Sequence, residues 1–266
     1  SCGFTHTLSI KTDGTLWSWG RGGSGQLGIG LTDINRSSPV QVGALQWKQV
    51  AAGRNCSFAI RSDDTLWSWG ASSDGGLGYT SAFNVASPIQ IGAETWKHVA
   101  TGSQSQTHSV AIKMDGTLWA WGNNAFGKLA DGTLNARSSP TQIGSDSDWI
   151  HCSAGADNGG AVKSNGTLWM WGNNFDGQLG QGDAGTGTHR SSPVQVGVAT
   201  NWASVYSDNT TMYAMKQNGE LWGCGFGTNG RLNNNENVNR STIVQIGARQ
   251  WVIFSMSSAM YGITKN

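Results

Sequence analysis

Short stretches of alternating apolar and polar residues recur along the whole chain, and turn residues separate them. Alternation with a period of two is typical of half-buried strands, and Asp-Gly or Asn-Gly between two such stretches indicates a hairpin. No stretch keeps a period of 3.6 residues, so we expect almost no helix. In the second repeat the pattern predicts strands at 47–53, 56–60, 65–69 and 88–92.

The third predicted strand of each repeat carries the motif Leu-Trp-x-Trp-Gly. The motif begins at Leu16, Leu66, Leu118, Leu168 and, in a modified form, Leu221, with spacings of 50 to 53 residues. A period near fifty with four short strands per unit indicates a β-propeller made of four-stranded antiparallel blades. The chain is therefore predicted to be all-β, with about five repeat units. The sequence leaves open whether they belong to a six- or seven-bladed ring.

We expect a single propeller domain over residues 1–266. Its units fall at roughly 1–43, 44–92, 93–144, 145–197 and 198–247, followed by a partial unit at 248–266. The chain begins within a second strand and ends after another one, which predicts open strand edges at both ends. Open edges attract other strands. Either residues 251–254 complete the first blade, or the ends pair with neighbouring chains; a third alternative is that the chain is a segment of a longer array.

All 14 tryptophans occupy recurring positions of the repeat. Each tryptophan buries roughly 150–250 Å², and stacked sheets need bulky side chains between them, so we expect the strand tryptophans to pack between blades. The tryptophans in the Leu-Trp-x-Trp-Gly motif are Trp17, Trp19, Trp67, Trp69, Trp119, Trp121, Trp169, Trp171 and Trp222. In the first four units one proline is expected to open the fourth strand, at an outer edge where its missing N–H is tolerated, and Ile243 takes this position in the fifth unit.

Composition narrows the function further. A net charge of +1 gives no reason to expect nucleic acid or an anionic membrane as a partner. The sequence has no apolar run long enough to span a bilayer. The four cysteines lie at unrelated positions without metal-ligand spacing, which favours buried free thiols and leaves one disulfide open.

No group of residues points to catalysis. His6 and His108 share a position in the second strand, where we expect a structural hydrogen bond, whereas we expect His98, His151 and His189 to share none. We therefore predict no catalytic residue, metal or cofactor. Binding specificity is expected in segments that differ between repeats. The candidate binding residues are Ser103, Gln104, Ser105, Gln106, Asp183, Thr186, His189, Asn234, Asn235 and Glu236.

The repeat resembles that of the regulator of chromosome condensation family. The residues that carry the resemblance are Gly3-Phe4-Thr5-His6-Thr7-Leu8-Ser9-Ile10, Asp13-Gly14, Trp19-Gly20, Gly25-Gln26-Leu27-Gly28 and the later stretch at 173–180. Cys56 departs from the family's histidine, and Ala130 and Asn233 depart from its loop glycine. The resemblance implies a propeller, usually seven-bladed, whose members bind proteins and in a few cases act as guanine-nucleotide exchange factors. It transfers no functional residue to this chain.

Taken together, these features predict a non-enzymatic propeller scaffold for protein–protein or surface interaction. One alternative is a glycan-binding adhesin or a virion or cell-surface receptor-binding protein, favoured by the Trp, Asn and Gly content; a second is a guanine-nucleotide exchange factor. The Arg-Ser-Ser-Pro stretches that begin at Arg36, Arg137 and Arg190 look like bacterial, phage and environmental members. We therefore expect an extracellular, cell-surface or virion location rather than a nuclear one.

Overall fold

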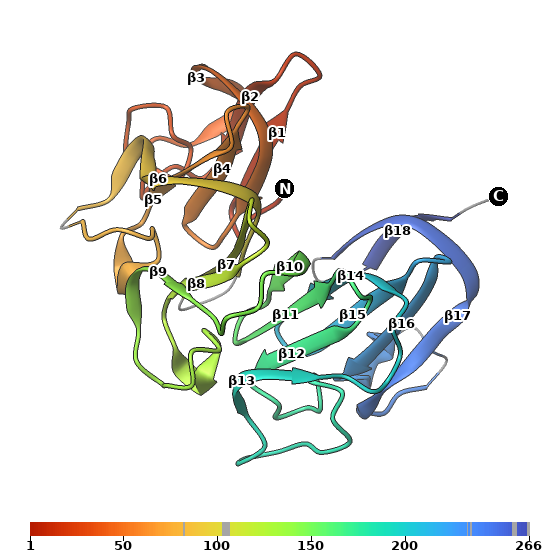
Figure 1. Cartoon of the computed structure of the whole chain (residues 1–266). Helices are drawn as coiled ribbons and strands as arrows, with labels where there is room; N and C mark the ends of the chain where they lie inside the picture. Colours follow the sequence, from red (N-terminus) through yellow and green to blue (C-terminus); the bar gives the residue numbers. More distant parts are fainter. Residues whose placement is uncertain (82, 103–106, 233, 235, 257–259, 265–266) are drawn as a thin grey trace. The chain divides into compact units, whose positions relative to one another are not determined.

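The computed structural model describes residues 1–81, 83–102, 107–232, 234, 236–256 and 260–264. Within them the chain is a series of antiparallel strands, and the only helical elements described are the short 3₁₀ turns η1 (Ser73–Gly75), η2 (Ala125–Gly127) and η3 (Thr228–Gly230) (Figure 1). The prediction of an all-β propeller with four-stranded antiparallel blades is confirmed. The strands are β1 (His6–Ile10), β2 (Thr15–Gly20), β3 (Arg36–Ala52), β4 (Cys56–Arg61), β5 (Thr65–Gly70), β6 (Val85–Thr101), β7 (His108–Lys113), β8 (Leu118–Gly122), β9 (Arg137–Gln142), β10 (Trp149–Ala154), β11 (Asn158–Lys163), β12 (Leu168–Gly172), β13 (Arg190–Gln195), β14 (Trp202–Ser207), β15 (Thr211–Lys216), β16 (Glu220–Gly225), β17 (Arg240–Met256) and β18 (Met260–Thr264).

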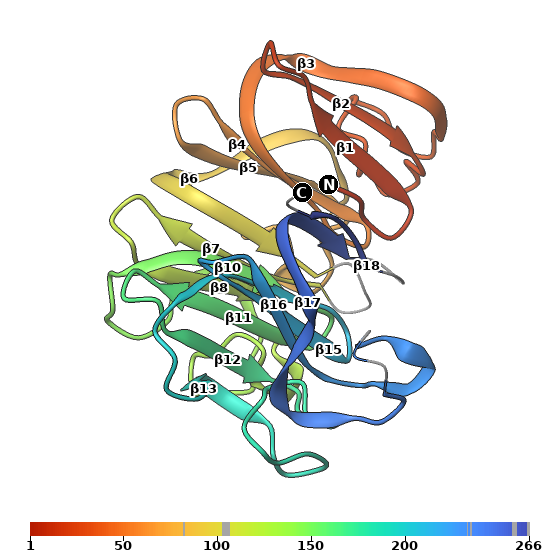
Figure 2. The same ribbon diagram turned by 90° about the vertical axis from the view of Figure 1, so that its right-hand side faces the viewer.

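Each repeat forms one blade, and we number the blades by repeat. Blade 4 is a separate sheet with strand order β10-β11-β12-β13. In β3, β6 and β17 the fourth strand of one blade runs without a break into the first strand of the next. Thus β3 pairs with β2 between Arg36 and Gln46, and with β4 from Trp47 onward. Figure 2 shows β17 curving between its two partners, β16 and β18.

The chain divides into two compact units. The first unit comprises Ser1–Asn124 and Asn135–Ser147, and the second comprises Ala125–Leu134 and Asp148–Asn266. The loop 125–134 connects β8 to β9 within the third repeat but belongs to the second unit.

The hairpin between the second and third strands is fixed by a recurring hydrogen-bond chain. Asp13 Oδ1 accepts hydrogen bonds from Thr15 N at 2.9 Å and Thr15 Oγ1 at 2.6 Å, and Trp17 Nε1 donates to Thr15 Oγ1 at 3.0 Å. Gly14 has a φ of 81°, a conformation that costs glycine nothing. Blade 2 has Asp64 in the corresponding turn, also at positive φ. The same chain recurs at Asp63-Thr65-Trp67, Asp115-Thr117-Trp119 and Asn165-Thr167-Trp169.

Within each unit, apolar side chains from facing blades form core clusters. Between blades 2 and 3, Phe58, Leu66 and Ile91 pack with Trp96 and Trp121 of the next blade. Full burial of a large apolar side chain stabilises the fold by about 1.5–3 kcal/mol. Corresponding clusters join blades 1 and 2 in the first unit and blades 4 and 5 in the second. The alternating pattern of the strands therefore places both faces of a blade against its neighbours.

The two tryptophans of each motif differ in their surroundings. The second tryptophan is fully buried in blades 2 to 4. Its indole N–H donates to a backbone carbonyl in the loop between the third and fourth strands of the preceding repeat. Trp69 donates to Gln26 O at 2.9 Å, and Trp171 donates to Lys128 O at 3.0 Å. The first tryptophan is half-buried at the rim, where its ring meets the tryptophan of its own blade's first strand nearly at a right angle, as with Trp47 and Trp67 at 87°.

The expectation that proline opens the fourth strand is wrong by three residues. Pro88 is the fourth residue of β6, which begins at Val85. The β5–β6 ladder pairs Gly70 with Val85 and Ser68 with Ile89, so Pro88 lies in the irregularity between these pairs. A proline in a bulge needs no ladder hydrogen bond. The strand therefore extends across it.

The ends of the chain differ in part from the expectation of two open edges. Ser1 and Cys2 already pair with β1, because Leu8 N donates to Ser1 O at 2.9 Å and Cys2 forms a bridge with Thr7. These two residues therefore occupy the place of a first strand in blade 1. At the other end, residues 251–256 of β17 pair with β18. Pairing of either end with a neighbouring chain stays a prediction.

Candidate functional site

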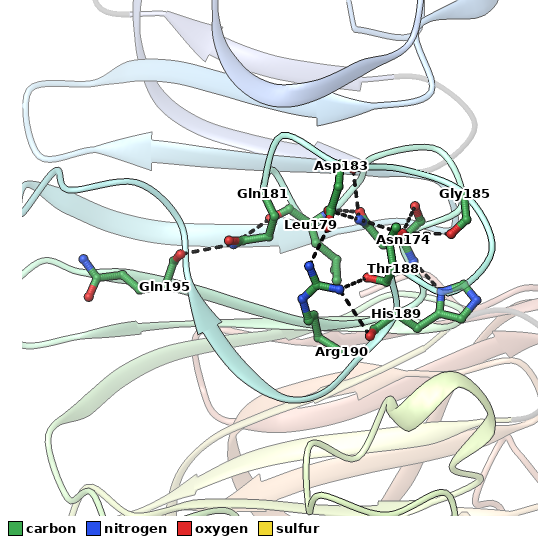
Figure 3. A network of polar contacts seen from close by, with 9 residues as sticks. All are labelled: Asn174, Leu179, Gln181, Asp183, Gly185, Thr188, His189, Arg190 and Gln195. Atoms are coloured by element: carbon green, nitrogen blue, oxygen red, sulfur yellow. Dashed lines mark hydrogen bonds and ion pairs between the residues drawn. The ribbon is translucent and has the colours of Figure 1, made fainter.

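The loop between β12 and β13 contains three of the candidate binding residues, and its centre is Asn174 (Figure 3). The Asn174 side chain is fully buried. Its Nδ2 donates to Asp183 Oδ1 at 2.8 Å and to Thr188 Oγ1 at 3.1 Å, and its Oδ1 accepts from Leu179 N at 3.0 Å. One amide side chain thus ties together both ends of the loop.

Asp183 and His189 are held inside this network. Arg190 Nη2 lies 2.5 Å from Asp183 Oδ2, and Asn174 N donates to His189 Nδ1 at 3.0 Å. Because Nδ1 accepts, a neutral His189 carries its proton on Nε2. Thr186, by contrast, is exposed. The loop is therefore a rigid platform. Its two ionisable candidate residues, Asp183 and His189, form hydrogen bonds that stabilise the conformation of the loop.

A second loop packs against this platform within the second unit. The ring of Phe126, from loop 125–134, meets the His189 ring at 5.0 Å in a T-shaped contact. Phe126 remains 41% exposed, Phe175 58% and Leu134 69%. We call the residues Phe126, Leu134, Phe175 and His189 of these two loops the apolar loop surface; the ring contact among them is the one between Phe126 and His189. Sequence reasoning missed this surface apart from His189, because an aromatic residue in a loop carries no periodic signal.

Loop 125–134 is anchored by a buried cation. Lys128 is fully buried, and its Nζ lies 2.8 Å from Asp157 Oδ1 and 3.2 Å from Ala156 O. Other repeats have glutamine at this position, at Gln26 and Gln178. The substitution to lysine is matched by the aspartate in the β10–β11 turn, so this loop is held more firmly than its polar sequence suggests.

The remaining candidate residues are scattered. Asn234 Nδ2 donates to Glu236 Oε2 at 2.8 Å, and Arg240 Nε donates to the same oxygen at 2.8 Å. The Arg240 guanidinium lowers the pKa of Glu236. Four candidates in the 103–106 stretch, together with Asn235, lie outside the described residues. Among the described candidates the structure therefore brings together two pairs, Asp183 with His189 around Asn174, and Asn234 with Glu236.

The histidines of the strands have structural roles. His6 Nε2 lies 2.8 Å from Ser57 Oγ, which itself donates to Gln26 O at 2.8 Å. Burial lowers the pKa of His6 to about 4, so its imidazole is neutral at pH 7. Such a buried neutral ring is suited to hold two blades together.

His98 and His151 do share a position, contrary to the sequence reading. Each follows the irregularity after the first tryptophan of its blade, at Trp96/His98 and Trp149/His151. His151 Nδ1 accepts from Val205 N at 3.4 Å. The tryptophan two residues earlier, Trp96 or Trp149, already carried this alignment in the sequence. The shared position connects the first strands of neighbouring blades, as Gln49 shows by bonding both Val99 N and Val99 O.

Three of the four cysteines are buried, and none of the four forms a disulfide. Cys56, Cys152 and Cys224 are the buried ones, whereas Cys2 is exposed. Burial raises the pKa of Cys56 to about 12, so its thiol stays protonated. No cluster of three or more His, Cys, Asp or Glu suited to a metal occurs among the described residues. Within the same ranges, no helix is long and apolar enough to cross a membrane.

Comparison with known proteins places these features in a family. Human E3 ubiquitin-protein ligase HERC2 is 27% identical over 144 residues, which is 53% of this chain and 3% of the ligase. The chain thus spans a small part of that relative. The crystal structure of human WBSCR16 has a TM-score of 0.83 at 20% identity, covering 96% of this chain and 68% of that one. Yeast RCC1 (Prp20), bound to Kap60, has a TM-score of 0.80 at 19% identity, covering 96% of this chain and 64% of that one.

The family model supplies the assignment. The regulator of chromosome condensation (RCC1) repeat matches residues 13–60, 115–162 and 165–207, which is more than half of the chain, and a second model of the same repeat matches 47–75. The matched segments contain the hairpin turns and the tryptophan motifs described above. This chain therefore belongs to the RCC1 repeat family.

Proposed function

We propose that the chain is a non-enzymatic scaffold that binds a protein partner through the apolar loop surface. The observation that carries the proposal is the exposure of Phe126, Leu134 and Phe175 on loops whose polar groups are bonded internally. Large exposed apolar side chains on a rigid support are typical of protein interfaces, which are enriched in aromatic residues. Rigid loops also lose little entropy on binding.

Other activities have less support. The chain matches only 3% of the length of HERC2, so the ligase activity in that protein's name does not transfer. Yeast Prp20 binds Kap60 in its crystal structure, which agrees with a protein partner, but at 19% identity the likeness concerns the fold.

We retain the proposal of an extracellular, cell-surface or virion location, supported by the Arg-Ser-Ser-Pro stretches. A nucleotide-release assay on small GTPases tests the exchange-factor alternative.

Site-specific photo-crosslinking tests the scaffold proposal. A photoreactive phenylalanine analogue replaces Phe175 in one protein and Val198 in the other; Val198 is 92% exposed but lies outside the apolar loop surface. With extract from the producing organism, we expect a discrete crosslinked protein from position 175 and none from position 198. The additional change Phe126→Ser should weaken the crosslink. Equal products from both positions, or a product that Phe126→Ser leaves unchanged, would contradict the proposal.

A further inference from the structure

A cavity of about 280 Å³ lies in the first unit, beside the turn that joins blades 2 and 3. Ile91, Trp119 and Pro140 form its apolar walls. Its polar lining comes from Glu94 and Lys113, among others. The volume is at the lower end of small-molecule sites and suits one ring rather than an extended ligand.

The aromatic wall is held in a fixed orientation. Trp119 Nε1 donates to Thr117 Oγ1 at 2.8 Å, and its ring meets the Trp96 ring at 80°. Lys113 Nζ lies 3.7 Å from the Trp119 ring centroid. Lys113 therefore covers one face of the Trp119 ring, and a ligand that contacts the rest of this fixed side chain pays no further ordering entropy for it.

The charged groups of the cavity balance each other. Lys113 Nζ lies 3.1 Å from Glu94 Oε2, and the Lys113 side chain is 11% exposed, against 61% for Glu94. An anion would meet the Glu94 carboxylate, and a cation would meet the Lys113 ammonium. A neutral ligand with both donors and acceptors can bond to each partner of the pair.

A third polar group lacks a protein partner. Trp96 lines the cavity and is 1% exposed, and its Nε1 has no hydrogen-bond partner in the structure. A buried N–H without an acceptor costs roughly 1–3 kcal/mol. The corresponding tryptophans of the other blades share this unpartnered N–H, so the repeat keeps a polar position here. At Trp96 an oxygen in the adjoining cavity could accept this hydrogen bond.

We propose that this cavity binds a single neutral sugar ring, such as the terminal residue of a glycan. The C–H groups of the ring pack against Trp119, Ile91 and Pro140. Its hydroxyls accept from Lys113 and the Trp96 indole and donate to Glu94. Hydroxyl groups both donate and accept, which matches this mixture of partners, whereas a purely apolar ligand would leave the Lys113–Glu94 pair to be desolvated. The site is separate from the apolar loop surface and does not depend on it.

The preceding blade offers a matched control. Ser139 lines the cavity and is exposed, and Ser87 is its exposed counterpart in the previous repeat. Leu45 occupies the position of Glu94 one repeat earlier, so the turn accepts a leucine there. Ser139→Trp therefore fills the cavity mouth and Glu94→Leu removes the acceptor, while Ser87→Trp adds the same bulk elsewhere.

Saturation-transfer NMR on the full chain, with the methyl glycosides of glucose, galactose, mannose and N-acetylglucosamine as probes, tests the proposal. We expect at least one glycoside to bind, with affinity reduced about tenfold or more by Ser139→Trp and by Glu94→Leu, and unchanged by Ser87→Trp. Thermal melting confirms that each variant is folded. The proposal is overturned if no probe binds, if Ser87→Trp weakens binding as much as Ser139→Trp, or if a triproline peptide binds in the cavity and the sugars do not.

Discussion

Lys128 Nζ lies 2.8 Å from Asp157 Oδ1, and this ion pair joins the β8–β9 loop of the third repeat to the β10–β11 turn of the fourth. The Lys128 side chain is fully buried, whereas that of Asp157 is 26% exposed. A buried ammonium without its carboxylate is strongly destabilising. This ion pair is therefore a local determinant of the second unit's stability.

We predict that Asp157→Asn lowers the free energy of unfolding by roughly 2–4 kcal/mol, which is below the full value for a buried pair because Asp157 is partly exposed. Urea denaturation measures the change. Adding Lys128→Gln, the residue found at this position in two other repeats, should recover most of the loss. Equal stability of the wild type and Asp157→Asn would show that the pair contributes little.

Asn174→Ala should open the β12–β13 loop. The substitution leaves Leu179 N without its acceptor and Asp183 Oδ1 without the Asn174 donor, each a loss of about 1–3 kcal/mol where the group is buried. We expect faster amide exchange and proteolytic cleavage within residues 181–190. Asn234→Ala, which removes an exposed amide, serves as the control. Unchanged protection of the loop would contradict the role assigned to Asn174.

Stability should fall in acid through buried histidines. Burial lowers the pKa of His98, like that of His6, from 6.5 to about 4. The unfolded chain therefore binds more protons between these pH values, so stability is complete above pH 6.5 and is lost as the pH falls toward 4. The loss amounts to about 3 kcal/mol for each histidine.

Melting curves between pH 4 and 7.5, in wild type and in His98→Gln, measure this effect. Glutamine occupies the same position at Gln49, so the variant should fold. We expect its stability to depend less on pH than that of the wild type. Identical pH profiles would assign the acid sensitivity to other groups.

The modified motif of blade 5 is compensated across the strand pair. Cys224 stands where other blades have the second tryptophan, and it pairs with Met212, whereas Trp69 pairs with Ser57 and Trp171 with Gly159. A small residue thus faces each tryptophan, and a large one faces the cysteine.

Restoring the tryptophan alone should therefore overpack the core. We predict that Cys224→Trp costs about 1–3 kcal/mol. In the double variant with Met212→Ser, most of that stability should return, which a double-mutant cycle by urea denaturation detects. If the effects of the two substitutions on the free energy of unfolding are additive, the side chains at positions 212 and 224 do not compete for the same space in the core.

Local chemistry explains what sequence reasoning predicted correctly. Asp13-Gly14 and its copies determine their hairpins within a few residues, and the alternation around Leu66 and Trp67 assigns both faces of a strand. The period near fifty residues then shows that the same blade recurs along the chain. Fold class and repeat architecture follow from these signals alone. The structural role of the candidate site residues could not be predicted in this way. The sequence showed that the loop at 183–189 differs between repeats, but not that Asp183 and His189 hold the loop together.

Only the tertiary structure decided which distant residues meet. Phe126 and His189 belong to different repeats, as do Lys128 and Asp157, and nothing in their local sequence records the contact. The position of Pro88 within β6 depended on a ladder irregularity opposite Ser68, which no propensity encodes. The sequence alone determined the blade, because hairpins and alternation are local. The packing of one blade on the next decided the surfaces and the cavity, because they depend on side-chain volumes and charges brought together from separate repeats.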